Sequence, residues 1–338
     1  MKLRLLEFIR CPLCKSSLKL LEETVSHAGD GQEVMSGFLQ CPGCGYRYLL
    51  EGGVPRLLAS ISTPVSQEKA RTASSYGYLW ARPVFSKEPK EFGPYHFDRM
   101  ERSLSLIPSG GLMLDAGCGA GIDLANQAQR PGVEIIGIEL SPGGCRSSFK
   151  RSVLLPNAHV VQGDLCRLPF DDNYFDFIYS YGVLHHLSSP REGLGELVRV
   201  LKPKARIGVY LYEDLATHAW GWRWLLKAAN QFRWMSCRLP HRLLYFLCWL
   251  ASPIVYLLFT LPFWILHRIP GVKTLAAHFP FRHASGPFSL AGDLYDRFSA
   301  PVEWRYSQAQ AIDLLQGAGL KEIQAVRDRG WMISGAKP

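Results

Sequence analysis

One stretch of this chain combines a buried strand with a glycine-rich turn, and it limits the possible folds more than any other feature. Residues 112–123 read LMLDAGCGAGID, an apolar strand that runs into three spaced glycines and then into a helix. Glycine accepts positive φ and has no Cβ, so a ligand can lie against bare backbone at the helix start. A second apolar segment, residues 134–139, ends in Glu139, 18 residues beyond Gly121. A carboxylate there can accept both hydroxyls of a ribose, and these features alone leave nicotinamide dinucleotides open.

The segments that follow narrow the class of nucleotide cofactor. Between residues 112 and 212 the chain carries, in order, LDAGCGAG, GIELS, GDLCRLPF, FDFIYS, VLHHL and LKP. This ordered series resembles the class I S-adenosylmethionine-dependent methyltransferases, in the family that includes quinone-biosynthesis enzymes. The resemblance implies an α/β fold with a Rossmann-like seven-stranded sheet and helices on both faces. It also implies S-adenosylmethionine as the methyl donor.

The resemblance assigns roles to residues along the expected carboxyl edge of the sheet. The glycine-rich motif matches the part that cradles the methionine and ribose, Glu139 matches the ribose acid, and Asp164 matches the acid that accepts from the adenine amino group. The positions carried over as cofactor-binding are Asp115, Gly117, Gly119, Gly121, Glu139, Asp164, Leu165 and Tyr181. One departure is visible, because Lys204-Ala205 stands where the family has Gly-Gly after L-K-P, which puts the shape of that turn in doubt.

A histidine pair follows the expected fourth strand. His185 and His186 lie just beyond residues 174–180, where the methyl acceptor should meet the cofactor. A neutral imidazole can take a proton from a hydroxyl, so both are candidate catalytic residues. In many relatives the pair looks structural and closes a turn, and that interpretation stays open. His96, Asp293, Tyr295 and Asp296 are weaker candidates for substrate contact.

Two signatures of other methylases are absent from the same region. Ser180-Tyr181-Gly182-Val183 stands where amino-group methylases of adenine or glutamine carry Asn/Asp-Pro-Pro-aromatic. No cysteine follows the strand, as covalent C5 methylation of a pyrimidine requires. Methylation at oxygen, nitrogen or carbon of a small or lipid-linked acceptor remains open.

Two pairs of cysteines near the N-terminus predict a metal site. Cys11 and Cys14 form one C-x2-C pair, and Cys41 and Cys44 form another after a 26-residue connection. Four thiolates suit a tetrahedral Zn²⁺, and a site closed by four protein ligands is structural. Incidental cysteines or a thioredoxin-like redox pair are the alternatives, but no βαβ pattern surrounds either pair. Residues 1–58, which include the hairpin pattern YRYLLEGGVPRLL, resemble the small zinc-ribbon family that includes an activating subunit of tRNA and protein methyltransferases.

The positive charge of the chain belongs to one segment. The formal net charge is +9, and residues 215–292 contain eight Lys or Arg and no Asp or Glu. The other 30 basic residues are balanced by 29 acidic ones. The function of residues 215–292 must therefore account for the basicity.

The centre of that basic segment is apolar. Residues 243–266 hold no charged side chain and, at about 1.5 Å per helical residue, are long enough to span a bilayer. A single span would leave the last two strands across the membrane from their sheet. Either the segment enters and leaves on one side, breaking at Pro253 and Pro262, or it lies in the membrane interface. Trp220, Trp222, Trp224 and Trp234, interleaved with arginines, favour the interface.

Other interpretations of this insertion compete with the membrane. It can be a pair of buried helices over the active site, or it can form a dimer contact. A basic surface with aromatic residues can also bind RNA, but 24 consecutive apolar residues are poor material for contacting phosphates. Nucleic acid therefore ranks behind lipid.

The remaining segments complete the expected organisation. Ser60–Ser75 is predicted to be a linker that leads into a helix. The aromatics that follow form a lid or pack outside the sheet: Tyr76, Tyr78, Trp80, Phe85, Phe92, Tyr95 and Phe97. Ser307 and Gln310 form a capping box that opens a helix, and two strands follow it. The expected domains are 1–59 (zinc ribbon), 60–110 (linker and lid), 111–213 (cofactor-binding core), 214–295 (basic apolar helical insertion) and 296–338 (last helix and strands).

We therefore expect a cytoplasmic methyltransferase, peripheral to the membrane, that acts on a hydrophobic or lipid-linked small molecule and contacts the membrane through residues 220–270. The start MKLRLLEFIRCP lacks the apolar run and cleavage site of a signal peptide, and the nine cysteines suit a reducing compartment. An RNA methyltransferase that uses the ribbon as a nucleic-acid module is the alternative. A non-enzymatic adaptor is a third interpretation, against which the intact glycine motif argues.

Overall fold

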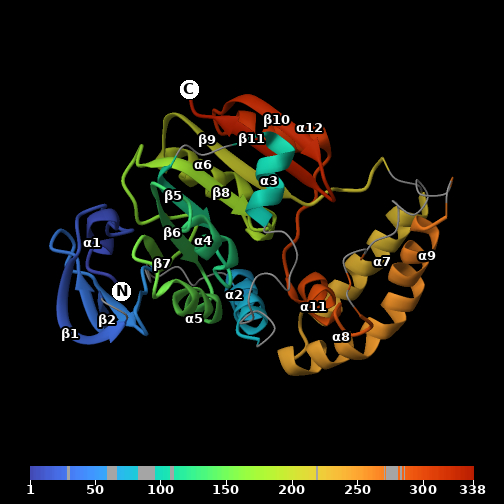
Figure 1. Cartoon of the computed structure of the whole chain (residues 1–338), viewed down its shortest axis with the longest axis horizontal. Coiled ribbons are helices and arrows are strands. Elements are labelled where there is room, and N and C mark those ends of the chain that lie inside the picture. The colour runs from blue at the N-terminus through green and yellow to red at the C-terminus, as the bar shows by residue number, and fades with distance from the viewer. Residues whose placement is uncertain are drawn as a thin grey trace. The chain divides into compact units, whose positions relative to one another are not determined.

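The chain folds into two compact units. The computed structural model describes residues 1–28, 31–58, 67–82, 96–106, 110–217, 220–269, 271, 281, 284 and 286–338. Unit 1 comprises Met1–Thr217 together with Val302–Pro338, and unit 2 comprises His218–Pro301. Unit 1 holds a small four-stranded sheet and a large seven-stranded sheet, whereas unit 2 is built from helices (Figure 1).

The seven-stranded sheet of unit 1 has the order β10-β11-β9-β8-β5-β6-β7. Its five mutually parallel strands are β5 (Gly111–Ala116), β6 (Val133–Glu139), β7 (Ala158–Gln162), β8 (Phe175–Tyr181) and β9 (Leu201–Leu211). The last two strands, β10 (Lys321–Arg327) and β11 (Trp331–Ala336), complete it, with β11 antiparallel to both neighbours. The seven-stranded sheet predicted from the motif series is confirmed.

Helices cover both faces of this sheet because its buried strands are apolar on both sides. In β5, Met113 faces one hydrophobic cluster and Leu114 faces the other. The first cluster includes residues of α3 (His96–Leu104) and α4 (Ile122–Gln127). The second includes residues of α6 (Pro190–Val200) and α12 (Gln308–Gly317). The predicted capping box is present, since Ser307 Oγ accepts from Gln310 N and the Gln310 side chain accepts from Ser307 N.

The zinc ribbon has its own sheet in the order β1-β2-β3-β4. Its elements are α1 (Leu5–Phe8), β1 (Lys19–Ala28), β2 (Gly31–Gln40), β3 (Arg47–Glu51) and β4 (Val54–Pro55). The predicted hairpin is β3–β4, whose turn consists of Gly52 and Gly53, both at positive φ. Hydrophobic residues of the ribbon, among them Leu5 and Leu39, join the cluster that lies against α6 and α12.

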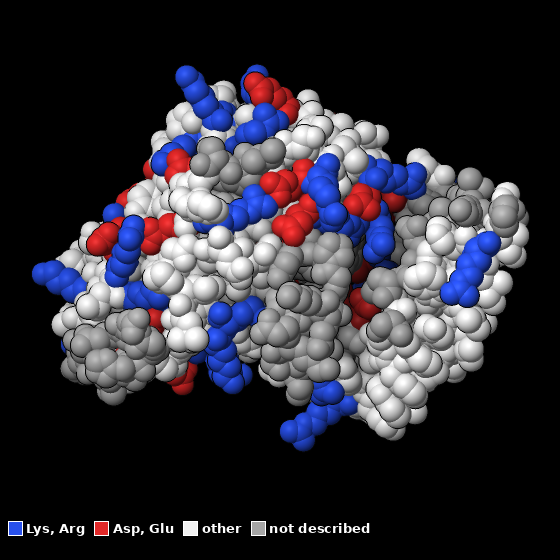
Figure 2. All heavy atoms as spheres, in the orientation of Figure 1, with Lys and Arg blue, Asp and Glu red and all other residues white. Residues whose placement is uncertain are grey.

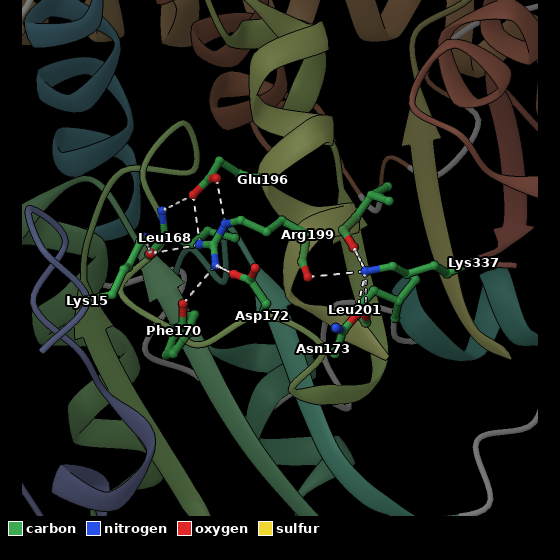
Figure 3. A network of polar contacts seen from close by, with 10 residues as sticks. Lys15, Leu168, Phe170, Asp172, Asn173, Glu196, Arg199, Leu201 and Lys337 are labelled. Carbon is green, nitrogen blue, oxygen red and sulfur yellow. Dashed lines mark hydrogen bonds and ion pairs between the residues drawn. The ribbon is translucent and has the colours of Figure 1, made fainter. Parts of the chain in front are cut away.

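The ribbon closes the edge of the large sheet, where β7 would otherwise expose its backbone. Arg56 pairs in parallel with Gln162 of β7, and Leu57 N donates to Gln162 O over 2.8 Å. Farther along the contact, Lys15 Nζ donates to Leu168 O over 2.7 Å (Figure 3). The edge strand is therefore covered by a domain of the same chain.

A polar network ties α6 to the loop that receives the ribbon (Figure 3). Arg199 donates to both carboxylate oxygens of Glu196, over 2.7 and 2.9 Å, and pairs with Asp172 over 2.6 Å. Burial alone would raise the pKa of Glu196, but the Arg199 hydrogen bonds and charge lower it below its usual value. At the end of the same helix, Lys337 Nζ donates to the carbonyls of Val198, Arg199 and Leu201 and to Asn173 Oδ1.

Unit 2 contains one continuous apolar helix. Its elements are α7 (Trp220–Ser236), α8 (His241–Val255), the π-helical turn η4 (Tyr256–Thr260), α9 (Leu261–His267) and α11 (Ala291–Ser299). Segments α8, η4 and α9 follow one another without interruption over residues 241–267. The breaks expected at Pro253 and Pro262 are absent: Pro253 lies inside α8, and Pro262 lies in the first turn of α9, directly after the π-turn. In the part of the chain that is described, this is the one helix long and apolar enough to cross a membrane.

The helix predicted to follow the linker begins earlier in the chain than expected. Helix α2 (Gln67–Trp80) begins within the stretch predicted to be a linker and includes Tyr76, Tyr78 and Trp80. Phe85, Phe92 and Tyr95, expected to contribute to a lid, lie outside the described residues, as do Lys273 and Arg282 of the basic segment. The turn after L-K-P keeps a left-handed backbone, with Lys204 at φ +65° in place of the usual glycine.

Candidate functional site

The predicted cofactor residues meet at one edge of the large sheet. The chain leaves β5 toward β6 and β7 on one side and returns through β8 on the other, so β5 and β8 form a topological switch point. Ligands of open α/β sheets bind beyond the carboxyl ends of the strands at such a point. Asp115, Glu139 and Tyr181 all lie at these strand ends.

The glycine-rich turn leaves no space for side chains. Gly117 has φ +88°, and a Cβ there would lie 2.3 Å from Val183 Cγ2. Gly119 has φ +51°, and a Cβ there would lie 2.9 Å from the ring of Trp80 on α2. The bare backbone of the turn therefore lies between the Trp80 indole and the loop after β8. Such a site suits a flat ligand that lies close to the backbone.

Glu139 is buried and held in place. Its Oε1 accepts from the backbone N and the Oγ of Ser141, over 2.8 and 2.6 Å, and its Oε2 accepts from Gly119 N over 3.1 Å. Burial raises the pKa of Glu139, and the hydrogen bonds from Ser141 and Gly119 oppose that shift. The carboxylate is thus oriented toward the glycine turn, as a ribose ligand requires.

Three buried acids surround the same turn. Burial raises the pKa of Asp115 well above its ordinary value, and the nearby charges of Asp123 and Glu139 raise it further. Such a concentration of carboxylates is unfavourable unless a cation lies among them. S-adenosylmethionine carries a sulfonium and an ammonium, so the residues present fit this cofactor.

Asp164 is already engaged by protein donors. Its Oδ1 accepts from Cys166 N over 3.0 Å, and its Oδ2 forms an ion pair with Lys69 of α2. Leu165 beside it is buried in the hydrophobic core. Lys69 is a site residue that the sequence did not reveal, because it lies in the stretch that was predicted to be a linker. Trp80 was among the aromatics predicted to form a lid or to pack outside the sheet.

Tyr181 lies in the middle of an aromatic stack. Its ring is parallel to those of His96 and Tyr210, at 4.3 Å from each, with an interplanar angle of 8° in both cases. Arg99 donates to the Tyr181 hydroxyl over 2.8 Å and pairs with Asp328 over 2.6 Å. This tyrosine, which was predicted to bind the cofactor, is therefore fixed on both faces and at its tip.

The two histidines predicted to be catalytic are buried. His185 is fully buried, and its ring lies 3.9 Å from that of Tyr212. His186 is 5% exposed, and its Nδ1 is 2.8 Å from Val302 O. Trp304 N donates to His185 O, so the pair anchors the chain as it re-enters unit 1. Their burial gives an acceptor little access to either imidazole.

The weaker predicted contacts on α11 belong to unit 2. Tyr295 is fully buried there, and its hydroxyl is 2.8 Å from His241 Nδ1. Asp293 and Asp296 lie on the same helix.

The four predicted zinc ligands are close together. All four sulfurs lie within 4.8 Å of one another, with 3.7 Å between Cys11 and Cys44 and 3.3 Å between Cys14 and Cys41. Sulfurs around a tetrahedral Zn²⁺ are about 3.8 Å apart, given Zn–S bonds of about 2.3 Å. None of these cysteines forms a disulfide. The donor set fits a structural Zn²⁺.

Comparisons with known proteins agree with this architecture. Residues 114–209 match the family model of the methyltransferase domain, and residues 2–53 match the Trm112p-like protein family. The sterol 24-C-methyltransferase of Schizosaccharomyces pombe is 32% identical over 107 residues, which cover 31% of this chain and 28% of that protein. The phthiotriol/phenolphthiotriol dimycocerosates methyltransferase of Mycobacterium tuberculosis is 32% identical over 123 residues, which cover 36% of this chain and 44% of that protein. The matched stretch thus spans less than half of either relative.

Among solved structures, the complex between the Haloferax volcanii Trm112 methyltransferase activator and a putative methyltransferase is similar at a TM-score of 0.46 and 15% identity, covering 78% of this chain and 97% of that one. The family matches rest on the two segments whose geometry is described above. Residues 114–209 therefore form a methyltransferase domain of the class I, S-adenosylmethionine-dependent type, and residues 2–53 form a Trm112p-like zinc ribbon.

Proposed function

We propose that the protein transfers the methyl group of S-adenosylmethionine to a hydrophobic or lipid-linked small molecule at a membrane surface. The cofactor supplies an electrophilic methyl on a sulfonium. The residues at the strand ends hold and orient it: the glycine turn and Glu139 on the ribose, Asp164 on the adenine side, and Tyr181 on the side of the acceptor. Much of the rate of such a reaction can come from positioning.

The observation that carries the membrane part of the proposal is an exposed apolar stripe on α8–η4–α9. Side chains on one side of this helix are 38 to 60% exposed: Phe246, Leu250, Ile254, Leu257, Leu261 and Ile265. Leu244, Cys248, Ser252, Thr260 and Phe263 face the interior. Contiguous exposed apolar surface of this kind marks an interaction site.

The π-turn keeps this stripe on one face. Phe263 lies 19 residues after Leu244, and at about 100° per residue a regular α-helix would place it roughly 100° around the axis. A π-turn accommodates one extra residue, which removes about 100° of rotation around the helix axis. Leu244 and Phe263 therefore both lie on the buried side. The buried side is fixed by Ser252 Oγ, which donates to Pro287 O, and Thr260 Oγ1, which donates to Phe281 O. A helix that is covered along one side and apolar along the other suits a position in the interface rather than a span.

The charge of unit 2 indicates which partner contacts the apolar stripe. The sequence from 215 to 292 contains no acid, and the face of unit 2 seen in Figure 2 is uncharged over most of its area. On α7, Lys227 Nζ lies 4.9 Å from the ring centre of Trp224, and at its end Arg238 lies 4.1 Å from that of Trp234. Cations paired with exposed tryptophans suit anionic headgroups at the membrane boundary. The relatives named above, which by their names methylate sterols and phthiotriols, support a lipophilic acceptor.

Co-sedimentation with vesicles tests this proposal. We expect the full chain to pellet with phosphatidylglycerol vesicles, and Ile254→Glu with Leu257→Glu to release it while the affinity for S-adenosylmethionine stays within about threefold. Gln129→Glu with Gln316→Glu adds the same charge at exposed positions of unit 1 and is the matched control. If the full chain and the double glutamate variant of α8–η4 partition equally, the stripe is not a membrane contact.

The RNA alternative is an outcome of a parallel binding experiment. The ribbon's cations are largely engaged within unit 1: Lys2 by Glu33, Arg4 by Glu134, Arg10 by Asp171, Lys15 by Leu168 O and Arg56 by Gln162. This occupancy leaves the ribbon poorly equipped to bind phosphates. Tight, steeply salt-dependent binding of tRNA together with no binding to vesicles would replace the lipid proposal.

A further inference from the structure

A histidine on α3 lies beside the acceptor side of the candidate site. The ring of His96, the first residue of α3, stacks on the outer face of Tyr181 at 4.3 Å. Tyr181 is the last residue of β8, at the strand end where the acceptor is expected to meet the methyl group. The side chain of His96 is 58% exposed, so a small molecule can reach its free edge.

A buried carboxylate holds one nitrogen of this histidine. His96 Nδ1 lies 3.4 Å from Asp123 Oδ2, within ion-pair distance. Asp123 is 8% exposed, and its own position is set by Phe97 N, which donates to Oδ1, and by the Tyr179 hydroxyl, which donates to Oδ2. A carboxylate that binds one imidazole nitrogen leaves the other directed away as a proton acceptor.

Tyr181 itself is poorly suited to act as the base. Burial raises the pKa of its hydroxyl, which therefore stays protonated at neutral pH. The hydroxyl also accepts from Arg99, whose Nε is bound to Asp328. The tyrosine is thus a platform, and the proton-accepting group of this stack is the imidazole.

We propose that His96 is the catalytic base of the methyl transfer and that Asp123 is its positioning residue, with an acceptor hydroxyl binding against Tyr181. This proposal rests on the proposed function. It also favours His96 over the buried His185 and His186 as the group that takes the proton.

The reaction balances without a further reactant. An oxygen lone pair of the acceptor forms the new bond to the methyl carbon while the bond between that carbon and sulfur breaks, and its electron pair stays on sulfur. The hydroxyl proton passes to Nε2 of His96. The products are a methyl ether, S-adenosylhomocysteine and an imidazolium that Asp123 stabilises until the exposed ring returns the proton to water.

The surroundings of His96 include both signs of charge. Asp123 of α4 faces its Nδ1, and Tyr179 of β8 donates to Asp123. Tyr181 of β8 stacks on the imidazole, Tyr210 of β9 continues the stack, and Arg99 lies one turn along α3. Arg99 is paired with Asp328, so Asp123 is the carboxyl group in direct reach of the imidazole.

Methyl transfer to a defined probe tests the proposal. The full chain on phosphatidylglycerol vesicles is given S-adenosylmethionine with a radiolabelled methyl and 4-dodecylcatechol or dodecylamine. We expect catechol labelling in which His96→Asn lowers kcat by about 10² to 10⁴-fold. KM for the catechol and the affinity for S-adenosylmethionine should stay within about threefold. Added imidazole should restore part of the rate to His96→Ala, and the acidic limb of the pH profile of kcat should be absent in His96→Asn.

Control variants define the results that would contradict the role of His96. Arg102→Gln, exposed on the same helix, should keep the full rate. If His96→Asn retains a rate within about threefold of the parent, or if His186→Asn alone abolishes it, His96 is not the base.

A second measurement tests the contact between His96 and Asp123 independently of activity. If neither probe is labelled, the proposed function fails for these two head groups, but the His96–Asp123 pair is still tested. In ¹⁵N-histidine spectra at pH 8, the proton of neutral His96 should reside on Nδ1 and shift to Nε2 in Asp123→Asn. A proton on Nε2 in both proteins would overturn the His96–Asp123 pair.

Discussion

At the scale of single residues, the buried acids at the candidate cofactor site destabilise the free protein. Burial raises the pKa of Asp115 well above 3.8, with Asp123 and Glu139 adding to the effect. Because the folded-state pKa is raised, the contribution of Asp115 to stability is fully present below about pH 4 and is lost as pH rises through the folded pKa. A bound cationic cofactor would offset the stability that is lost when Asp115 ionises.

Asp115→Asn separates stability from binding. We expect this variant to raise the free energy of unfolding of the free protein by about 1–2 kcal/mol at pH 7.5, and the gain should vanish toward pH 4. Its affinity for S-adenosylmethionine should fall by at least about tenfold. Denaturant titrations across pH, with calorimetric binding, measure both quantities. A variant that is less stable at pH 7.5 would show that Asp115 is ionised at low cost.

Lys204 offers a second residue-level test, because a non-glycine residue at φ +65° is strained. Its backbone N donates to Lys337 O over 2.8 Å, so the conformation is held by the sheet edge. We expect Lys204→Gly to raise the free energy of unfolding by about 0.5–1 kcal/mol. Lys202→Gly, two residues earlier and not at positive φ, should lower it. A loss of stability in Lys204→Gly would mean that the lysine side chain contributes more than the strain costs.

At the scale of elements, the contact between ribbon and sheet edge contains a buried histidine. His159 of β7 lies edge-on to Phe8 of α1 and donates from Nε2 to Glu134 over 3.0 Å. Burial, together with the charges of Lys2 and Arg4, lowers the pKa of His159 to about 3. The stability that depends on neutral His159 is therefore present above pH 6.5 and is lost as pH falls toward 3.

We expect acid to weaken the contact between ribbon and sheet through this residue. Between pH 6.5 and 5 the parent should lose about 2 kcal/mol more than His159→Gln, which cannot titrate. Urea titrations at each pH give the difference. Parallel pH curves for the two proteins would show that His159 protonates as easily in the folded chain as in the unfolded one.

At the scale of the whole molecule, unit 2 is inserted between neighbouring points of unit 1. Tyr306 N donates to Tyr212 O over 2.9 Å, and Asp214 N donates to Tyr306 O over 3.0 Å. The chain therefore leaves and re-enters unit 1 side by side, as tolerated insertions do. The sheet, the glycine turn and the four cysteines all belong to unit 1.

Replacing residues 218–301 by a short Gly/Ser linker should accordingly leave a folded protein. We expect it to bind one Zn²⁺ and to keep its affinity for S-adenosylmethionine within about threefold, while binding to phosphatidylglycerol vesicles is lost. Metal analysis, calorimetry and co-sedimentation check these three outcomes. Failure of this shortened chain to fold would show that unit 1 needs unit 2.

Local sequence alone determined the parts of this protein whose chemistry is contained in a short segment. The spaced glycines, the two C-x2-C pairs and the capping box at Ser307 predicted the cofactor turn, the metal cluster and a helix start, because backbone freedom, thiolate spacing and side-chain capping act within a few residues. The tertiary structure decided what depends on contacts between distant segments: that Lys69 reaches Asp164 and Trp80 reaches the glycine turn, that His96 meets Asp123 and Tyr181, and that His185 is buried. It also decided that the helix continues through Pro253 and Pro262, with a π-turn between them that keeps one face packed and the other apolar. These features follow from which surfaces pack together, and packing between segments far apart in the chain leaves no local pattern in the sequence.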